Sequence, residues 1–372
     1  MESRVPSSDS PELSVVVLFT HDPVLARRCV DSIAALGSEI PQAETIFLLG
    51  GSSPEVRKVI AGTVGARVID SPVNLGTSVA WQLGFNAAKG RHVLLMHEDA
   101  VATPGMAKSL IDALDSDPAA AVVAPWLAER DDDAPSNCGW AWFRGLTQTR
   151  LLPEHVPPEL RGAPYAVDGV SSAITLWDRS AWLEGGGFDE RNFPALGVDA
   201  DACTSAWARG RSVLVDPRTL AVHRTGAMDD APGRLSGKFV RYFMLERFER
   251  LWQQKWGEMS DWYTELAAET GVVNPEEGAV RAAHLRRAER PQLAGPVPLA
   301  QHPFTDPEGT GAQPTEVDAQ LAERLRIAVD AATDEYHLWL IEHSEREHAE
   351  IEHLNEAVRS MYAREAATIK ER

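Results

Sequence analysis

Short runs of apolar residues alternate with helical patterns from Leu13 to about His223. The run LSVVVLF (13–19) is typical of a buried strand, and similar runs follow at 45–49, 66–69, 91–96 and 121–126. Between these runs, apolar residues recur three and four positions apart, which predicts helices over 22–37, over 74–90 and from 104 onward. Strands that alternate with helices predict an α/β fold, with a mainly parallel sheet flanked by helices.

The pattern changes after about residue 228, where long helical segments are predicted over 235–270 and 274–290. Several prolines and glycines over 291–315 are typical of a linker. Apolar positions recur from 316 to 372 in steps of three and four, which predicts one long amphipathic helix that forms a homodimer or packs on the neighbouring helical region. We therefore expect a flexible tail (1–12), an α/β domain (13–227), a helical region (228–290), a linker (291–315) and a coiled-coil-like helix (316–372).

Composition limits the classes of partner. Fifty-five acidic and 36 basic residues give the 372-residue chain a net charge of −19, which opposes binding to nucleic acid or to an anionic membrane. The three cysteines lie far apart in no metal-ligand spacing, so neither a disulfide framework nor a zinc ribbon is indicated. Because no apolar run matches a signal peptide or a membrane span, we expect a cytoplasmic protein with at most peripheral membrane contact.

Ligands of open α/β sheets bind beyond the carboxyl ends of the strands. Thr20 and Asp22 follow the first predicted strand, and His97-Glu98-Asp99 follows the fourth. No GxGxxG turn, phosphate-binding P-loop or Gly- and Arg-rich first turn is found, which excludes dehydrogenases, P-loop enzymes and nucleotidyltransferases. Carboxylates at the fourth strand suit a hard divalent cation, although a solvated acidic turn would look the same.

Two further groups of polar residues lie downstream. Asp199 and Asp201 stand just before a predicted helix, and His223 follows a predicted strand. An aspartate in this place serves either as an acid–base group or as a helix cap, and such a histidine serves as a ligand or as an edge residue. The run Asp131-Asp132-Asp133 is interpreted as a solvated loop.

Together these motifs resemble the family-two inverting glycosyltransferases with a GT-A fold, over residues 13–226. His97-Glu98-Asp99 stands at the family's D-x-D position. The other matching residues are Asn74-Leu75-Gly76 with Ala80, Gln82, Gly84, Ala88 and Gly90, then Gly187-Phe188-Asp189-Glu190, Asp199-Ala200-Asp201, and Pro217 with His223. The chain departs from the family pattern at Gly50 or Gly51, Gln82, His97 and Val198.

The resemblance implies transfer of a sugar, with inversion, from a nucleoside-diphosphate sugar to a hydroxyl acceptor. It implies Mg²⁺ or Mn²⁺ held by Asp99 and His223, and Asp199 as general base, which an ordinary pKa near 4 would keep ionised. The residues implied to contact the donor are Thr20, Asp22, Asn74, Gly76, Gln82, Glu98 and Asp99. Trp140 and Trp142 are interpreted as an acceptor platform or as packing, and Asp201 as an acceptor contact or a cap. The alternative is a catalytically inactive, sugar-binding or scaffold protein, which the four departures favour.

Overall fold

The structure is a computed structural model that describes residues 3–5, 7–36, 39–71, 76–131, 133–143, 147–185, 187–190, 192–193, 196–224 and 238–289. The linker predicted over 291–315, and the long helix and dimer contact predicted over 316–372, lie outside these residues. Residues 1–234 and 245–312 form one compact unit, and residues 235–244 and 313–372 form a second. The first unit contains the sheet and all of the described residues except 238–244. In the described part of the chain, no helix has the length and apolar character needed to span a bilayer.

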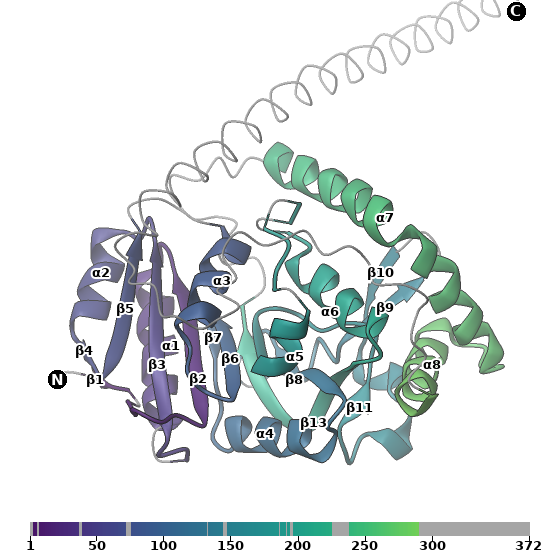
Figure 1. Ribbon diagram of the computed structural model, residues 1–372, viewed down its shortest axis with the longest axis horizontal. Helices are drawn as coiled ribbons and strands as arrows, with labels where there is room; N and C mark the ends of the chain where they lie inside the picture. The colour runs from purple at the N-terminus through teal and green to yellow at the C-terminus, as the bar shows by residue number, and fades with distance from the viewer. Residues whose placement is uncertain are drawn as a thin grey trace, which may run out of the picture. The chain divides into compact units, whose positions relative to one another are not determined.

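A nine-stranded sheet forms the centre of the first unit (Figure 1). Its order is β11-β13-β8-β12-β6-β2-β3-β5, with β7 paired to β13. The strands are β2 (Leu13–Phe19), β3 (Ala43–Gly50), β5 (Ala66–Ser71), β6 (His92–His97), β7 (Ala100–Val101), β8 (Ala120–Ala128), β11 (Tyr165–Ala166), β12 (Ile174–Asp178) and β13 (Ser212–His223). The predicted α/β class is confirmed, but the sheet is mixed. Strands β5, β3, β2 and β6 run parallel as predicted, whereas β12 runs antiparallel between β6 and β8.

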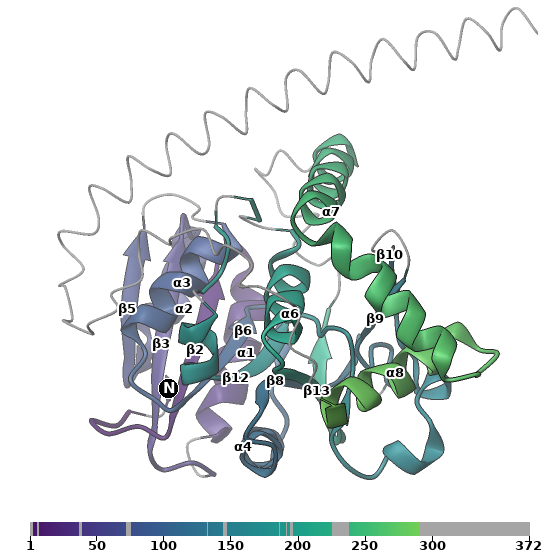
Figure 2. The same cartoon turned by 45° about the vertical axis from the view of Figure 1, so that its right-hand side comes forward.

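Helices cover the faces of this sheet (Figure 2). They are α1 (Pro23–Leu36), α3 (Thr77–Ala87), α4 (Met106–Ser116), α5 (Arg179–Glu184) and α6 (Val198–Ala208), and α8 (Pro275–Glu289) packs against β11. Helix α2 (Pro54–Ala61) packs on α1, and α7 (Lys238–Glu269) precedes α8 in the chain. Every residue of β2 and β3 is buried because both faces of these strands are covered. Two short 3₁₀ helices, η2 (Pro153–His155) and η3 (Pro158–Leu160), and a hairpin of β9 (Trp140–Phe143) and β10 (Thr147–Arg150) complete the unit.

Helix α3 lies unusually close to the sheet at Gly84. A Cβ atom added there would be 2.3 Å from Val16 Cγ1 of β2, so only glycine permits this approach. Gly90, after the helix, is equally restricted, because an added Cβ would be 2.6 Å from the Ser14 backbone nitrogen. These two contacts fix α3 beside the strands whose carboxyl ends carry the candidate site.

The amino-terminal residues correct one expectation. Residues 1–12 were expected to form a flexible tail, but β1 (Ser3–Arg4) pairs in parallel with β4 (Thr63–Val64). Val5 is buried, and its N–H donates to the Val64 carbonyl at 2.9 Å. Burial of this one apolar side chain and pairing of its backbone are sufficient to attach the segment to the domain.

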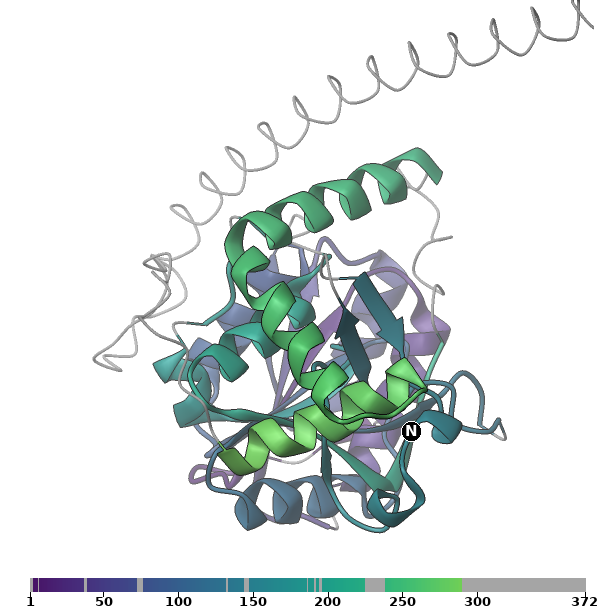
Figure 3. The ribbon, with the colours of Figure 1, turned by 90° about the vertical axis from the view of Figure 1, so that its right-hand side faces the viewer.

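Helix α8 is joined to the sheet unit by a buried ion pair, and Figure 3 shows α8 from the side of the unit that it covers. The Arg286 guanidinium pairs with the Asp168 carboxylate, and both side chains are at most 2% exposed. The same guanidinium lies 4.9 Å from the centre of the Trp207 ring in α6. Burial lowers the pKa of Arg286 to about 9, so the side chain stays charged at neutral pH. The helical region that was expected to follow the α/β domain is therefore, from residue 245 onward, part of the same unit.

This ion pair gives a stability prediction. Arg286→Met should lower the free energy of unfolding by about 3–5 kcal/mol, because it leaves the Asp168 carboxylate buried without its cation. The matched control is Arg281→Met, which removes partly exposed ion pairs to Glu159 and Glu277 and should cost less than about 1 kcal/mol. Urea titrations followed by tryptophan fluorescence measure both values. Equal small losses in the two variants would contradict the importance of the Arg286 pair.

Candidate active site

The carboxyl end of β6 runs directly into Glu98, whose side chain is buried and fully engaged. Its carboxylate accepts hydrogen bonds from the Thr20 backbone N–H at 2.9 Å, the Thr20 hydroxyl at 2.6 Å and the His21 N–H at 3.1 Å. Burial raises the pKa of Glu98, although these bonds oppose the effect. Thr20 and Glu98, both expected to contact a donor, instead bind each other and fix the turn after β2.

Asp99 and His223 meet at the same edge of the sheet. Antiparallel pairing of β13 with β7 sets His223 opposite Ala100, which places its Nε2 atom 3.6 Å from Asp99 Oδ2. Burial raises the pKa of the Asp99 carboxyl, but hydrogen bonding to His223 and the charges of His97 and His223 outweigh it, so the pKa lies below its usual value. Asp99 is therefore ionised at neutral pH. The sequence prediction that these two residues lie together is consistent with this geometry.

The Asp99 carboxylate has the features of a metal ligand. Its Oδ1 atom is buried and has no hydrogen-bond partner among the described residues. A buried anionic oxygen without a partner is costly, and a divalent cation is one group that would satisfy it. Carboxylate and imidazole are both ligands that Mn²⁺ accepts. No group of three or more candidate ligand residues occurs in the part of the chain that the structure describes, so the protein offers this pair and leaves positions for other ligands.

Asp199 lies in the first turn of α6, which begins directly after the left-handed residue Gly197 (φ +81°). Its carboxylate accepts hydrogen bonds from the Ser172 N–H at 3.2 Å and the Ala200 N–H at 2.9 Å. Burial raises the pKa of this carboxyl, and those hydrogen bonds lower it only in part. The ordinary pKa expected from a position at a helix start is thus wrong, because burial outweighs the favourable backbone dipoles.

The turn before β12 links Asp199 to the end of β6. Ser172 holds the Asp199 carboxylate, and the carbonyl of the next residue, Ala173, accepts from the His97 N–H at 3.0 Å. Ladder pairing of Ile174 with Met96 continues this contact along β12 and β6. The candidate base and the Asp99–His223 pair are therefore connected through a few backbone hydrogen bonds at one edge of the sheet.

Asp201 faces a different set of partners. Its carboxylate accepts from Trp256 Nε1 at 2.7 Å and pairs with Lys255 Nζ at 2.8 Å, both from α7. The side chain is buried, so these contacts leave no open face for an acceptor. Of the two roles considered for Asp201, acceptor contact does not fit this structure, and the residue attaches α6 to α7 instead.

The two tryptophans expected near an acceptor have different surroundings in the structure. Trp142 is 1% exposed and packs edge-on against Trp252 at 5.1 Å, so it is a core residue and not an acceptor platform. A Cβ atom on Gly169 would be 2.2 Å from the Trp142 ring, which shows how closely the backbone approaches it. Trp140 is partly exposed, with the Arg150 guanidinium 5.7 Å from its ring centre.

The remaining expected donor contacts are dispersed. Gln82 is fully buried in α3 and accepts from the Phe188 N–H at 3.1 Å, so it braces the loop that follows α5. Asp22 caps α1 by accepting from the Val24 and Leu25 N–H groups at 2.8 and 3.0 Å. Gly76 forms the amino-terminal cap position of α3 with φ +71°. Asn74 lies outside the described residues.

Lys255 was not predicted from the sequence, although it is central to the contacts of Asp201. It also pairs with Asp189 Oδ2 at 2.9 Å. A lysine on a helix rich in charged residues is typical of a solvated face, and only the tertiary structure shows that this one points inward.

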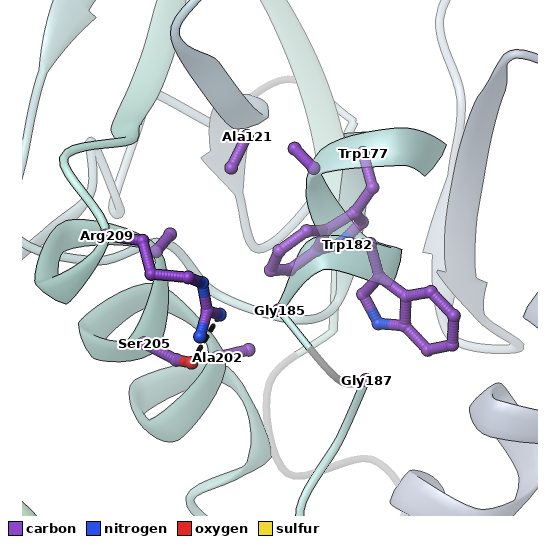
Figure 4. Close-up of a pocket in the computed structure, with 10 residues that line it drawn as sticks. Ala121, Trp177, Trp182, Gly185, Gly187, Ala202, Ser205 and Arg209 are labelled. Atoms are coloured by element: carbon purple, nitrogen blue, oxygen red, sulfur yellow. Dashed lines mark hydrogen bonds between the residues drawn. The ribbon is translucent and has the colours of Figure 1, made fainter. Parts of the chain in front are cut away.

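A small cavity lies between α5 and α6 (Figure 4). Its lining includes Trp177, Trp182 and Arg209, and the Arg209 guanidinium donates to the Ser205 hydroxyl at 2.6 Å. On the α6 side the lining consists of Ala202, Ser205, Ala206 and Arg209, and it includes neither Asp99 nor Asp199. The cavity therefore belongs to the packing of α5 and α6.

Comparisons with known proteins show which proteins part of this chain is similar to. Residues 14–159 match Glycosyl transferase family 2. The chain is 25% identical over 234 residues to the O-antigen biosynthesis protein RfbC of Myxococcus xanthus. The matched region covers 60% of this chain but only 18% of that protein.

Two solved structures are similar in fold. One is GalNAc-T7 with UDP, GalNAc and Mn²⁺, at a TM-score of 0.51 and 17% identity, covering 76% of this chain and 55% of that one. The other is the mannosyltransferase PcManGT of Pyrobaculum calidifontis with GDP-Man and Mn²⁺, at a TM-score of 0.46 and 14% identity. This match covers 88% of this chain and 89% of that one. The first similarity shows the GT-A-type fold, and the second is too distant to add to it.

The Glu98 contacts give a prediction for the turn after β2. Glu98→Gln should lower the free energy of unfolding by about 1–3 kcal/mol, because a side-chain amide cannot accept three hydrogen bonds and would place an N–H against backbone donors. Glu55→Gln, in the exposed first turn of α2, is the control and should change stability by less than about 0.5 kcal/mol. Chemical denaturation measures both, and an unchanged Glu98→Gln protein would show that this anchor is not needed.

Proposed function

We propose that the chain, whose residues 14–159 match Glycosyl transferase family 2, transfers a sugar from a nucleoside-diphosphate sugar to a hydroxyl acceptor with inversion at the anomeric carbon. The observation that carries the proposal is the position of three groups at one sheet edge. Asp99 and His223 form a pair there, and Asp199 is held by the turn that contacts the end of β6. These are the groups that such a transfer needs: a place for a cation and a proton acceptor.

Donor binding in this proposal uses Mn²⁺ or Mg²⁺. The similar fold of GalNAc-T7 was solved with UDP and Mn²⁺, which makes this class of ligand a reasonable one for the present site. Asp99 and His223 would hold the ion, and diphosphate oxygens and water would fill its other positions. When bound, the ion supplies positive charge that stabilises the departing diphosphate.

Asp199 acts as the general base. The acceptor hydroxyl attacks the anomeric carbon as the bond from that carbon to the diphosphate oxygen breaks, and the hydroxyl proton passes to the Asp199 carboxylate. The hydroxyl is far too weak an acid to lose its proton beforehand, so transfer to a positioned base accompanies the attack. Hydrogen bonds from the Ser172 and Ala200 N–H groups orient the carboxylate and leave further lone pairs for the proton.

The role of the metal pair gives one prediction. Binding of UDP, GDP or dTDP should require Mn²⁺, and Asp99→Asn should weaken it by at least about tenfold. Asp112→Asn, a change on the exposed face of α4, should leave binding unchanged. Isothermal titration calorimetry with Mn²⁺ or with EDTA measures these affinities. Binding that is equally tight in EDTA, and in Asp99→Asn with Mn²⁺, would remove the metal from the proposal.

The general base gives another prediction. Asp199→Asn keeps the size of the side chain and one accepting oxygen but removes its basicity, so the turnover number should fall by at least about a hundredfold. Affinity for the nucleoside diphosphate should stay within about threefold of wild type, because Asp199 does not hold the donor.

The assay is release of nucleoside diphosphate from a panel of nucleotide sugars, with Asp112→Asn as the control variant. Near-normal turnover in Asp199→Asn would assign the base elsewhere. No turnover by the wild-type protein with any donor and acceptor would favour the catalytically inactive, sugar-binding or scaffold alternative.

A further inference from the structure

Lys255 reaches from α7 into a buried site between two aspartates. Its Nζ atom lies 2.8 Å from Asp201 Oδ1 and 2.9 Å from Asp189 Oδ2, and the Lys255 side chain is only 16% exposed. The ammonium also lies over the rings of Trp256 and Phe193, at 5.2 and 5.6 Å from their centres. Although burial opposes its charge, the two carboxylates raise the pKa of Lys255, which keeps it protonated at neutral pH.

The two aspartates stand on either side of the segment that carries the candidate base. Asp189 precedes it and caps its own turn by accepting from the Asn192 N–H at 3.2 Å. Asp201 follows Asp199 by two positions in α6, so the two side chains point to different sides of the helix. The first turn of α6 thus presents Asp199 on one side and is held through Asp201 on the other.

Helix α7 also packs against the residues just before α6. Gly197, the residue before α6, has φ +81°, and a Cβ atom added to it would be 2.0 Å from the Phe248 ring. Phe248 stacks on Trp252, with ring centres 5.2 Å apart. The Arg247 guanidinium donates to the Asn192 carbonyl at 2.5 Å. Helix α7 therefore contacts the segment from Asp189 to Asp201 at its beginning, middle and end.

We propose that Lys255 is a positioning residue for the transfer reaction, which fixes the first turn of α6, and with it Asp199, by bridging Asp189 and Asp201. This inference rests on the proposed function. The Ser172 N–H that donates to the Asp199 carboxylate does so at a long distance of 3.2 Å, so the position of Asp199 also depends on how the first turn of α6 is held. A base displaced by about 1 Å can lose about a hundredfold in rate, which is why a residue that touches no substrate matters here.

The role predicts a specific kinetic signature. Lys255→Met should lower the turnover number by at least about tenfold, whereas the KM for the nucleotide sugar should change by less than about threefold, because the donor pair lies on β6 and β13. Lys255→Arg, which keeps a cation between the carboxylates, should retain most of the turnover. Arg286→Met is the matched control: it removes a cation buried elsewhere and should leave the turnover number of the folded protein unchanged.

Two further measurements separate positioning from simple loss of stability. Lys255→Met combined with Asp201→Asn removes the cation together with one of the two carboxylates that would otherwise lose their partner, so the protein should fold. Its turnover number should still be at least about tenfold below that of the wild type. Amide hydrogen exchange over 197–203 should be faster in this double variant and in Lys255→Met, but not in Lys255→Arg or Arg286→Met.

The outcomes are distinguishable. An active wild type with unchanged turnover in Lys255→Met, restored turnover in the double variant, or unchanged exchange over 197–203 would overturn the positioning role alone. An inactive wild type would overturn the proposed function, and the positioning role with it.

Discussion

Backbone pairing at the carboxyl ends of β6, β12 and β13 is the constraint on which the candidate site depends. The β13–β7 register brings His223 to Asp99, and the β12–β6 register carries the turn that holds Asp199 to the same edge. A shift of one residue in the β13–β7 ladder would turn the His223 side chain to the opposite face of the sheet. The proposed chemistry therefore depends on strand register, because the register places these residues at one edge of the sheet.

Buried negative charge is the second feature of the site. Glu98, Asp99, Asp189 and Asp201 are all buried, and a carboxylate removed from water is costly unless something replaces the water. Backbone and hydroxyl donors replace water at Glu98, and His223 replaces it at Asp99. Lys255 pairs with both Asp189 and Asp201. Burial also raises the pKa of Asp199, although the Ser172 and Ala200 N–H groups donate to its carboxylate. A base in such a place holds a proton more readily than an exposed aspartate does.

The sequence predicted the parts of this structure that local patterns encode. Apolar runs located β2, β3 and β6 because strands buried on both faces have no polar alternation, and the edge that carries Asp99 followed from them. The antiparallel insertion of β12 was not predictable, because the residues of a strand do not determine which strands pair with it. Trp142, Gln82 and Lys255 were misjudged or missed for a related reason: their surroundings are supplied by segments far away in the chain, and a lysine on a charged helix gives no sign that it points inward.

The pH dependence of kcat/KM for nucleoside diphosphate release, measured with saturating Mn²⁺, tests the central claim that Asp199 is a general base with a raised pKa. A raised pKa means that Asp199 takes up a proton at a higher pH than an exposed aspartate, so activity should begin to fall earlier as the pH is lowered. The account predicts an acid limb with an apparent pKa above the ordinary value of about 3.9. Activity that stays constant down to about pH 4, in protein shown to be folded throughout, would contradict it.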